Sequence, residues 1–378
     1  MNKTYFGRKE LDKIDEILKL ISPKNIFLVT GKKSYQTSGA EEILSHKLKN
    51  YKFIHFNNFQ ANPKIEDIKK GIEIYNNNSC DITIAVGGGS VIDVAKTINS
   101  ASKLTQTNTI EYLIINNVHH ESSNTLIALP TTAGSGSEST HFAVVYIGEK
   151  KYSYSNKNLL PNYVFLVPDF LKKISKYQFA CSAADALCQA IESYWAVNSN
   201  AESKNYAIES IKLIKENLFN SAVNDCYESK SKILLAANLS GKAINISKTT
   251  GAHAISYSLT SFFNIPHGHS VSIFLPIFIK FNYEITENDC NHNQGSNYVK
   301  TSIKELSRLF ELSNPNELPA YFVKLFNSIG LTNSLKDLNI LTEKNIDLIL
   351  NSVNLERSAN NPRKISYSSF KEYILNEI

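Results

Sequence analysis

Three histidines lie close together between residues 251 and 276, where the surrounding side chains are apolar or hydroxylic. They are His253, His267 and His269, out of nine histidines in the chain. Burying an unpaired imidazole costs about 1–3 kcal/mol, so each needs a hydrogen bond or a metal ion. Any one of them could be a surface or core histidine with an ordinary partner. Their clustering makes a metal site the hypothesis to test.

A strongly helical segment upstream offers oxygen ligands for such a site. Within residues 182–195, Asp185 and Gln189 stand four positions apart, so both side chains point from one face of a helix. Together with His253 and His267 they make a mixed set of oxygen and nitrogen ligands that suits a divalent ion such as Fe²⁺ or Zn²⁺.

The first half of the chain alternates buried strands with amphipathic helices. Strands are expected near 25–31, 51–59, 80–87 and 125–130, and helices near 11–21, 38–48, 65–78 and 91–101. This alternation predicts an α/β domain with a parallel, Rossmann-like sheet that is covered on both faces. From about residue 177 helical periods dominate, so we expect an α/β domain over 1–178 and an all-helical domain over 179–378.

Two turns of the α/β half have residues that suit phosphate. Gly87, Gly88 and Gly89 close a strand and Ser90 opens a helix, so backbone amides at the helix N-terminus could bind a pyrophosphate. The turn lacks both GxGxxG and the GK[ST] ending of a P-loop, so a tight turn without a ligand remains open. A second glycine and hydroxyl cluster follows the strand at 125–130. Two such turns on one sheet favour a dinucleotide, and with the metal site they suggest hydride transfer at a domain cleft.

The composition is that of an ordinary globular protein. Hydrophobic residues make up 42% and charged residues 20%, and the net charge of +5 is scattered, so nucleic-acid binding is not indicated. The five cysteines form no CxxC pair, which favours a reducing compartment. The first twenty residues mix acids and bases, so we expect neither a signal peptide nor a membrane span, and a cytoplasmic location.

Four motifs resemble those of the iron-dependent, group III alcohol dehydrogenases, in the order of that family and over nearly the whole chain. They are AVGGGSVIDVAKTI, LPTTAGSGSEST, AADALCQAIESYW and GAHAISYSLTSFFNIPHGH. The resemblance implies the architecture shared with dehydroquinate synthase, with a dinucleotide-binding domain and a helical domain for metal and substrate. It also implies NAD(P)H-dependent reduction of a small aldehyde to a primary alcohol, and a homodimer or larger homo-oligomer.

The resemblance assigns residues by position. The metal ligands that it implies are Asp185, Gln189, His253 and His267, and the catalytic residues expected are Tyr257, His267 and His269. The implied cofactor-binding residues are Gly31, Ser34, Gly87, Gly88, Gly89, Ser90, Asp93, Thr131, Thr132, Ser135 and Lys151.

Two positions depart from the family pattern. Gln189 stands where the second ligand is usually a histidine, which could lower metal affinity. Tyr257 replaces a histidine near the substrate; its phenol could give a proton to the nascent alkoxide, directly or by water, or it could simply pack.

Several segments further resemble the branch that reduces phosphonoacetaldehyde to 2-hydroxyethylphosphonate. These segments are DALCQAIESYW, SGKAINISKTTGAHAISY, IPHGHSV and ANNPRKIS. A phosphonate dianion needs fixed cations, and we expect Lys248 or Arg363 to hold it, with solvated surface charge as the alternative for each. The rival functions are a general short-chain alcohol dehydrogenase, a dehydroquinate-synthase-like lyase, and a silent relative that binds nucleotide but no metal.

The choice of cofactor depends on the turn after the first predicted strand. Gly31 stands where NAD-preferring relatives commonly have an acid, and Lys32, Lys33 and Ser34 follow it. A 2′-phosphate would meet positive charge there, so we expect NADPH, with NADH also serving.

Overall fold

The computed structural model describes residues 2–102, 104, 109–118, 124–353, 358–366, 370, 371 and 373–375. The chain forms two units, Met1–Ile174 and Ser175–Ile378. The domain boundary expected near residue 178 falls in the first turn of α7 (Lys176–Trp195), the helix that begins the second unit. Ser175 caps this helix, since its side chain accepts a hydrogen bond from the amide of Gln178.

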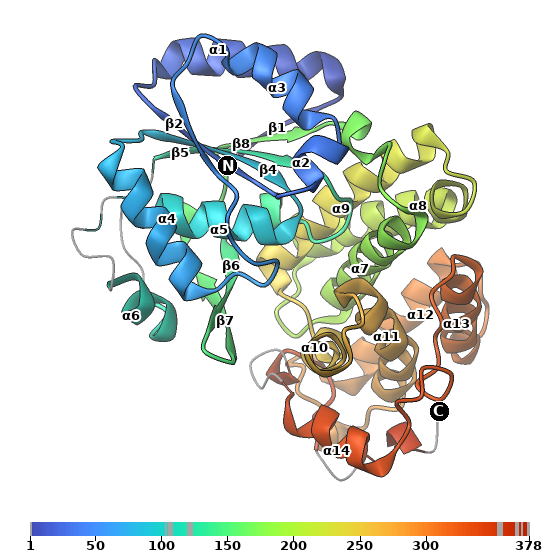
Figure 1. Cartoon of the computed structure of the whole chain (residues 1–378). Coiled ribbons are helices and arrows are strands. Elements are labelled where there is room, and N and C mark those ends of the chain that lie inside the picture. The colour runs from blue at the N-terminus through green and yellow to red at the C-terminus, as the bar shows by residue number, and fades with distance from the viewer. Residues whose placement is uncertain are drawn as a thin grey trace. The chain divides into compact units, whose positions relative to one another are not determined.

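A six-stranded parallel sheet forms the centre of the first unit (Figure 1). Its strands are β1 (Lys3–Phe6), β2 (Ile26–Thr30), β3 (Phe53–Phe56), β4 (Ile82–Gly87), β5 (Thr125–Pro130) and β8 (Tyr163–Leu166). Their order is β1-β8-β5-β4-β2-β3. The chain passes from β2 out to β3 and then returns to β4 on the other side of β2. The carboxyl ends of β2 and β4 therefore flank a point where the strand order reverses, which is where ligands bind in open parallel sheets.

The two central strands are buried along their whole length. Every residue of β2, IFLVT, and of β4, ITIAVG, is buried. Continuous apolar runs of this kind form strands that are covered on both faces. The predicted fold class, a parallel α/β domain followed by a helical one, is confirmed.

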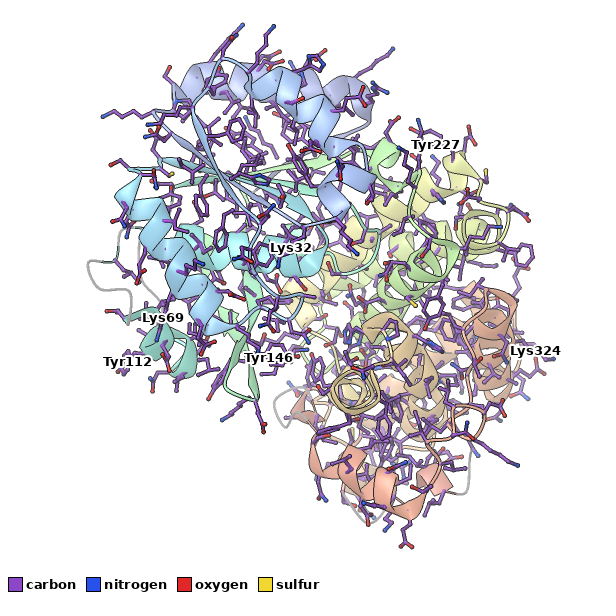
Figure 2. All side chains as sticks on the ribbon, in the orientation of Figure 1. Lys32, Lys69, Tyr112, Tyr146, Tyr227 and Lys324 are labelled. Atoms are coloured by element: carbon purple, nitrogen blue, oxygen red, sulfur yellow. The ribbon has the colours of Figure 1, made fainter. Side chains whose placement is uncertain are left out.

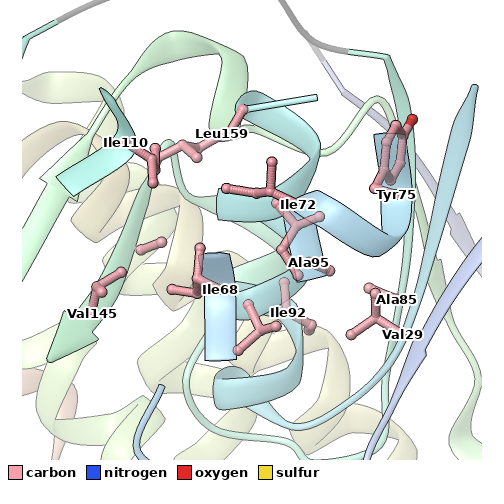
Figure 3. Close-up of a cluster of buried hydrophobic side chains, with 14 of the residues drawn as sticks. Val29, Ile68, Ile72, Tyr75, Ala85, Ile92, Ala95, Ile110, Val145 and Leu159 are labelled. Atoms are coloured by element: carbon pink, nitrogen blue, oxygen red, sulfur yellow. The ribbon is translucent and has the colours of Figure 1, made fainter. Parts of the chain in front are cut away.

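Helices cover both faces of the sheet. On one face α1 (Asp12–Ile21) and α3 (Ala40–Leu48) share a core with the strands. On the other face, α4 (Ile65–Asn77), α5 (Gly89–Ser100) and α6 (Thr109–Ile115) do so, and Figure 3 shows Ile68 and Ile72 of α4 with Ile92 of α5 in this core. The unit also contains the short helix α2 (Ser34–Thr37), the antiparallel pair β6 (Phe142–Ile147) and β7 (Lys150–Ser155), and the 3₁₀ turns η1 (Arg8–Leu11), η2 (Ser137–Ser139), η3 (Lys157–Leu159) and η4 (Pro168–Leu171).

The described part of the second unit consists of helices and turns, with one isolated bridge between Cys290 and Arg363. Besides α7, its helices are α8 (Ala201–Ala222), α9 (Tyr227–Ser247), α10 (Gly251–Phe263), α11 (His267–Tyr283), α12 (Gly295–Leu309), α13 (Leu318–Ser328) and α14 (Glu343–Asn351), with the 3₁₀ turns η5 (Glu287–Asp289) and η6 (Pro315–Glu317). Helix α7 is central, because it is buried from Phe179 to Trp195 and packs against α8, α9 and α11. None of the described helices has the length and apolar character needed to cross a membrane.

Candidate metal centre and dinucleotide-binding turns

One carboxylate and two imidazoles from three helices meet in the second unit. Asp185 comes from α7, His253 from the first turn of α10, and His267 is the first residue of α11. Their ligand atoms all lie within 4.8 Å of one another. Asp185 Oδ1 is 3.2 Å from His253 Nε2 and 3.8 Å from His267 Nε2. Ligands of a tetrahedral ion at about 2.1 Å stand about 3.4 Å apart, so this set fits a divalent ion.

A glycine lets two of these helices approach closely enough to form the cluster. A Cβ at Gly268 would lie 1.9 Å from the carbonyl oxygen of Cys181 and 2.9 Å from Cβ of Asp185. Any larger residue would therefore push the start of α11 away from α7. His267 and Asp185 can converge only because the residue between the two histidines of HGH has no side chain.

Glu192, which was not among the predicted site residues, supports the cluster by contacting the nitrogen of His253 that faces away from Asp185. Its Oε2 contacts Nδ1 of His253, so that nitrogen carries the proton and Nε2 is left for an ion. Its Oε1 accepts hydrogen bonds from the amides of Ala252 at 2.8 Å and His253 at 3.2 Å, and from Oγ1 of Thr250 at 2.9 Å. The same carboxylate thus caps α10 and fixes the ring of His253. Trp195 Nε1 completes the arrangement by donating to Thr250 Oγ1 at 3.0 Å.

The charges of this cluster stabilise one another in a buried setting. Burial acts to raise the pKa of the Asp185 carboxyl, but the imidazoles of His267 and His253 hold that pKa below its ordinary value. Burial likewise opposes ionisation of Glu192, yet His253 and the hydrogen bonds from α10 lower its pKa. Against the effect of burial, the two carboxylates raise the pKa of His253. Two ionised carboxylates therefore surround His253, which favours a cation at this place.

Gln189 lies beside Asp185 but is engaged in supporting it. Its side chain is hydrogen-bonded to the Asp185 carboxyl, which helps to lower the pKa of that group. Its Oε1 accepts from Ser240 Oγ at 3.2 Å. With the amide nitrogen used for Asp185 and the oxygen used for Ser240, Gln189 must turn its amide over before the oxygen can serve an ion. Its role as fourth ligand stays a prediction.

Tyr257 is stacked on the second histidine of the cluster. The rings of Tyr257 and His267 are nearly parallel, with centroids 5.6 Å apart and 8° between their planes. Tyr257 is half-buried one helical turn after His253. The structure therefore brings the predicted proton donor next to the predicted metal ligands.

His269 lies on the same helix as His267 but makes contacts of a different kind. Its Nε2 donates to the carbonyl of Thr332 at 2.9 Å, and its Nδ1 lies 2.9 Å from the hydroxyl of Tyr177. Because a carbonyl only accepts, Nε2 carries the proton and Nδ1 accepts from Tyr177; burial also lowers the pKa of this imidazole. With both nitrogens engaged, His269 has a structural role in this geometry, and its predicted part in proton transfer gains no support from it.

The two predicted anion-binding cations differ in their surroundings. The Arg363 Nε donates to Asp289 at 2.7 Å, its Nη1 donates to the carbonyl of Phe281 at 2.7 Å, and its guanidinium lies 4.3 Å from the centre of the Phe281 ring. Arg363 is thus tied into the helical unit, and the geometry gives no support to its predicted contact with substrate. Lys248 is exposed in the turn between α9 and α10, five residues before His253.

In the first unit, three turns from neighbouring strands bring the predicted cofactor residues together. Cβ atoms at Gly31 and Gly87 would each meet the side chain of Val91, and one at Gly89 would lie 2.8 Å from Ser135 Oγ. Gly88 faces Thr132 in the same way, at 3.3 Å. The turns after β2, β4 and β5 therefore converge at the N-terminus of α5, where Ser90 lies.

A buried hydroxyl group in this region lacks a partner within the described part of the chain. Thr131 is 4% exposed, and its Oγ1 accepts and donates no hydrogen bond there. A phosphate or ribose oxygen of a dinucleotide would satisfy it. Together with the open amides that begin α5, this fits the predicted dinucleotide.

Beneath these turns a buried acid and a buried lysine join α5 to the second turn. Asp93 accepts hydrogen bonds from Ser137 Oγ and, at 3.0 Å, from the amide of Val144. Lys96 donates to Thr140 Oγ1 and to the carbonyl of Phe142, both at 3.0 Å. Both carboxylate oxygens of Asp93 are thus occupied by protein groups, so its placement supports the turn that would bind the cofactor.

The remaining predicted cofactor residues lie at the edges of this region. Ser34 sits against Gly31, since a Cβ there would be 2.2 Å from Ser34 Oγ. Lys32, labelled in Figure 2, is exposed in the turn after β2. Lys151 is half-buried on β7. Burial raises the pKa of Asp93, and the charge of Lys151 is among those that oppose this shift.

Comparison with known families covers both units. The family described as "Iron-containing alcohol dehydrogenase" matches residues 2–168, and the one described as "Fe-containing alcohol dehydrogenase family, C-terminal" matches residues 179–376.

Individual relatives include two aldehyde reductases and a long-chain alcohol dehydrogenase. A phosphonoacetaldehyde reductase from Streptomyces viridochromogenes is 26% identical over 298 residues, which cover 76% of this chain and 74% of the relative. A long-chain primary alcohol dehydrogenase from Thermoanaerobacter ethanolicus is 30% identical over 292 residues, 75% of this chain and 73% of the relative. Among solved structures, a sulfoacetaldehyde reductase from Bifidobacterium kashiwanohense in complex with NAD⁺ superimposes with a TM-score of 0.88 at 25% identity. It covers 100% of this chain and 98% of its own.

Proposed function

The chain belongs to the iron-containing alcohol dehydrogenase family, and from this premise we propose that it reduces small anionic aldehydes, phosphonoacetaldehyde first, to primary alcohols with NADPH or NADH. The observation that carries this proposal is the convergence of Asp185, His253 and His267 on one point in the helical unit. The three turns at the N-terminus of α5 supply the complementary feature, a place for the dinucleotide.

The residues of the helical unit have distinct tasks in this reaction. When bound, the divalent ion would polarise the aldehyde carbonyl and the reduced nicotinamide would supply the hydride. Glu192 keeps the proton of His253 on Nδ1, so that Nε2 stays available as a ligand. The phenol of Tyr257, stacked on His267, donates the proton that converts the alkoxide oxygen to a hydroxyl.

Two relatives and one cation of this chain support an anionic head group on the substrate. Both the phosphonoacetaldehyde reductase and the sulfoacetaldehyde reductase have names that specify a two-carbon aldehyde with a tetrahedral anionic group. The exposed Lys248, five residues before His253, supplies a positive charge on the segment that leads into the cluster. Sulfoacetaldehyde is therefore the second candidate substrate.

The experiment is a comparison of aldehydes in an assay of NADPH and NADH oxidation, with the enzyme loaded with Fe²⁺ or Zn²⁺. We expect kcat/KM to be roughly tenfold or more higher for phosphonoacetaldehyde than for propionaldehyde, because a charge-assisted contact contributes about 1.5–3 kcal/mol. Inhibition by inorganic phosphate, competitive with the aldehyde, should accompany this preference. Equal kcat/KM for the charged and the neutral aldehyde would indicate a general short-chain alcohol dehydrogenase instead.

A further inference from the structure

The turn between α9 and α10 contains a lysine in a backbone conformation that is ordinarily reserved for glycine. Lys248 has φ 60° and ψ 179°, where the Cβ of an L-residue crowds its own backbone. Ser22 and Asn264 also end helices with positive φ, but their ψ values of 58° and 26° place them in the left-handed helical region, which polar residues tolerate better. Lys248 therefore stores strain that a glycine would not.

A single side chain binds the carbonyl groups of the residues before and after this lysine. Asn360 donates from Nδ2 to the carbonyl of Ser247 at 2.8 Å and to the carbonyl of Thr249 at 2.9 Å. Its Oδ1 accepts from the amide of Asn198 at 3.1 Å. Asn360 is 5% exposed, so its amide has few positions open to it. The surrounding structure thus over-determines the turn, which is the condition under which strained backbone persists.

The same turn leads directly into α10, which carries His253 of the candidate metal site. Thr250 and His253 follow within five residues, and both are bound by Glu192. A displacement of the turn would therefore change the direction in which the lysine side chain leaves the backbone and, with it, the entry into α10. A glycine at this position would relieve the strain but remove the cation.

We propose that Asn360 is a positioning residue that holds Lys248 in this strained turn, and that the lysine is kept there because its ammonium group selects anionic aldehydes. The second half of this inference rests on the proposed function. The first half concerns the fold alone.

Two substitutions of the lysine separate charge from strain. Lys248→Gly and Lys248→Ala both remove the ammonium group, but only glycine relieves the backbone. We expect the Tm of Lys248→Gly to exceed that of Lys248→Ala by roughly 2–6 °C. In both variants the ratio of kcat/KM for phosphonoacetaldehyde to that for propionaldehyde should fall roughly tenfold or more.

The effect of removing the Asn360 side chain should depend on which residue stands at position 248. Asn360→Ala should lower the Tm of the otherwise unchanged enzyme more than it lowers the Tm of Lys248→Gly, since glycine adopts this conformation without support. It should also raise the KM for phosphonoacetaldehyde more than the KM for propionaldehyde, which a general loss of stability would not do. If Asn360→Ala yields no folded protein, the pair of lysine variants decides the question of strain.

The outcomes distinguish the two halves of the inference. Equal Tm values for Lys248→Gly and Lys248→Ala would overturn the proposed role of Asn360 in holding a strained turn. So would an equal Tm loss from Asn360→Ala in the unchanged enzyme and in Lys248→Gly. An unchanged ratio between the two aldehydes in both lysine variants would overturn the selectivity. A full-length enzyme that reduces no aldehyde with either cofactor would contradict the proposed function instead. The Tm comparison would still test whether Asn360 holds the turn at Lys248.

Discussion

At the scale of single residues, Glu192 has more influence on the cluster than its absence from the ligand set suggests. Glu192→Gln keeps an oxygen for the amides of α10 but replaces the carboxylate that faces Nδ1 of His253. We expect the affinity for Zn²⁺ or Fe²⁺ to fall roughly 10–100-fold with little loss of Tm, as measured by competition with a chromogenic chelator. Glu192→Ala should lose both metal affinity and Tm because α10 also loses its cap. An unaltered metal affinity in Glu192→Gln would contradict the role given to this carboxylate.

Gln189 offers the opposite test, in which metal binding should improve. Its amide now donates to Asp185 and accepts from Ser240, whereas an imidazole is a stronger ligand for these ions. Gln189→His should raise the affinity for Zn²⁺ roughly tenfold or more in the same chelator competition. Ser240→Ala, which removes the hydrogen bonds from Ser240 Oγ to Gln189 Oε1 and to the carbonyl of Ala237 but leaves Gln189 in place, serves as the control. Weaker binding by Gln189→His would show that the amide is better suited to this site than a histidine.

The sequence indicated the three members of this cluster better than the residues that support them. Asp185, His253 and His267 could be found because histidines cluster between residues 251 and 276, and because a helical segment upstream carries an acid. Glu192 lies seven residues after Asp185 and so on a related face of α7, which was a usable signal. Its partner His253 is 61 residues away, however, and only the packing of α10 against α7 shows the contact. Asn360 lies in the ANNPRKIS segment, but nothing in that segment indicated its contact with the turn at Lys248.

At the scale of the helices, the cluster depends on the contact between α7 and α11. Gly268→Ala would place a Cβ 1.9 Å from the carbonyl oxygen of Cys181, which forces the helices apart. We expect a loss of about 1–3 kcal/mol in the free energy of unfolding and little metal retained after dialysis, measured by urea denaturation and by elemental analysis. Ser272→Ala, at another buried position of α11, should retain its metal. Full retention of metal by Gly268→Ala would show that the cluster tolerates a wider helix spacing.

Helix α5 is joined to the turn after β5 by a buried charge, and this contact should give the stability a characteristic dependence on pH. Burial lowers the pKa of Lys96 from 10.5 to about 8, although Asp93 and Glu138 oppose the shift. Between pH 8 and 10.5 the unfolded chain therefore binds more protons at this residue than the folded chain, so its contribution to the free energy of unfolding rises with pH.

Lys96→Met removes this titration. The free energy of unfolding of the unchanged protein, relative to that of Lys96→Met, should rise by about 1–3 kcal/mol between pH 8 and 10, as followed by urea denaturation at each pH. Tyrosines that titrate near pH 10 are common to both proteins and cancel in the difference. A difference that does not change with pH would mean that Lys96 is not perturbed in this way.

The main helices, the central strands and the edge strand β3 were predictable from apolar periodicity, and the other edge strand, β1, was not. Strand β1 has only four residues, KTYF, with a half-exposed pattern, so it resembles a polar terminal segment. It forms because its partner β8, which is about 160 residues away, offers a parallel edge. Pairing over such a distance leaves no local trace in the sequence.

At the scale of the whole molecule, each unit supplies one part of the proposed chemistry. The first unit has the turns that suit a dinucleotide, and the second has the acid and imidazoles that suit an ion. A substitution in the candidate metal site should therefore leave the predicted cofactor-binding residues in place. The central claim is that Asp185, His253 and His267 form a single binding site for a divalent ion.

The most direct test of this claim is the metal content of the protein and of His267→Ala, after both are loaded with Fe²⁺ without oxygen, or with Zn²⁺, and freed of excess ion. We expect about one ion per chain in the unchanged protein. The variant should hold less than roughly a tenth of that, because loss of the His267 imidazole leaves only two of the three ligands. Equal metal content in the two proteins would contradict this claim.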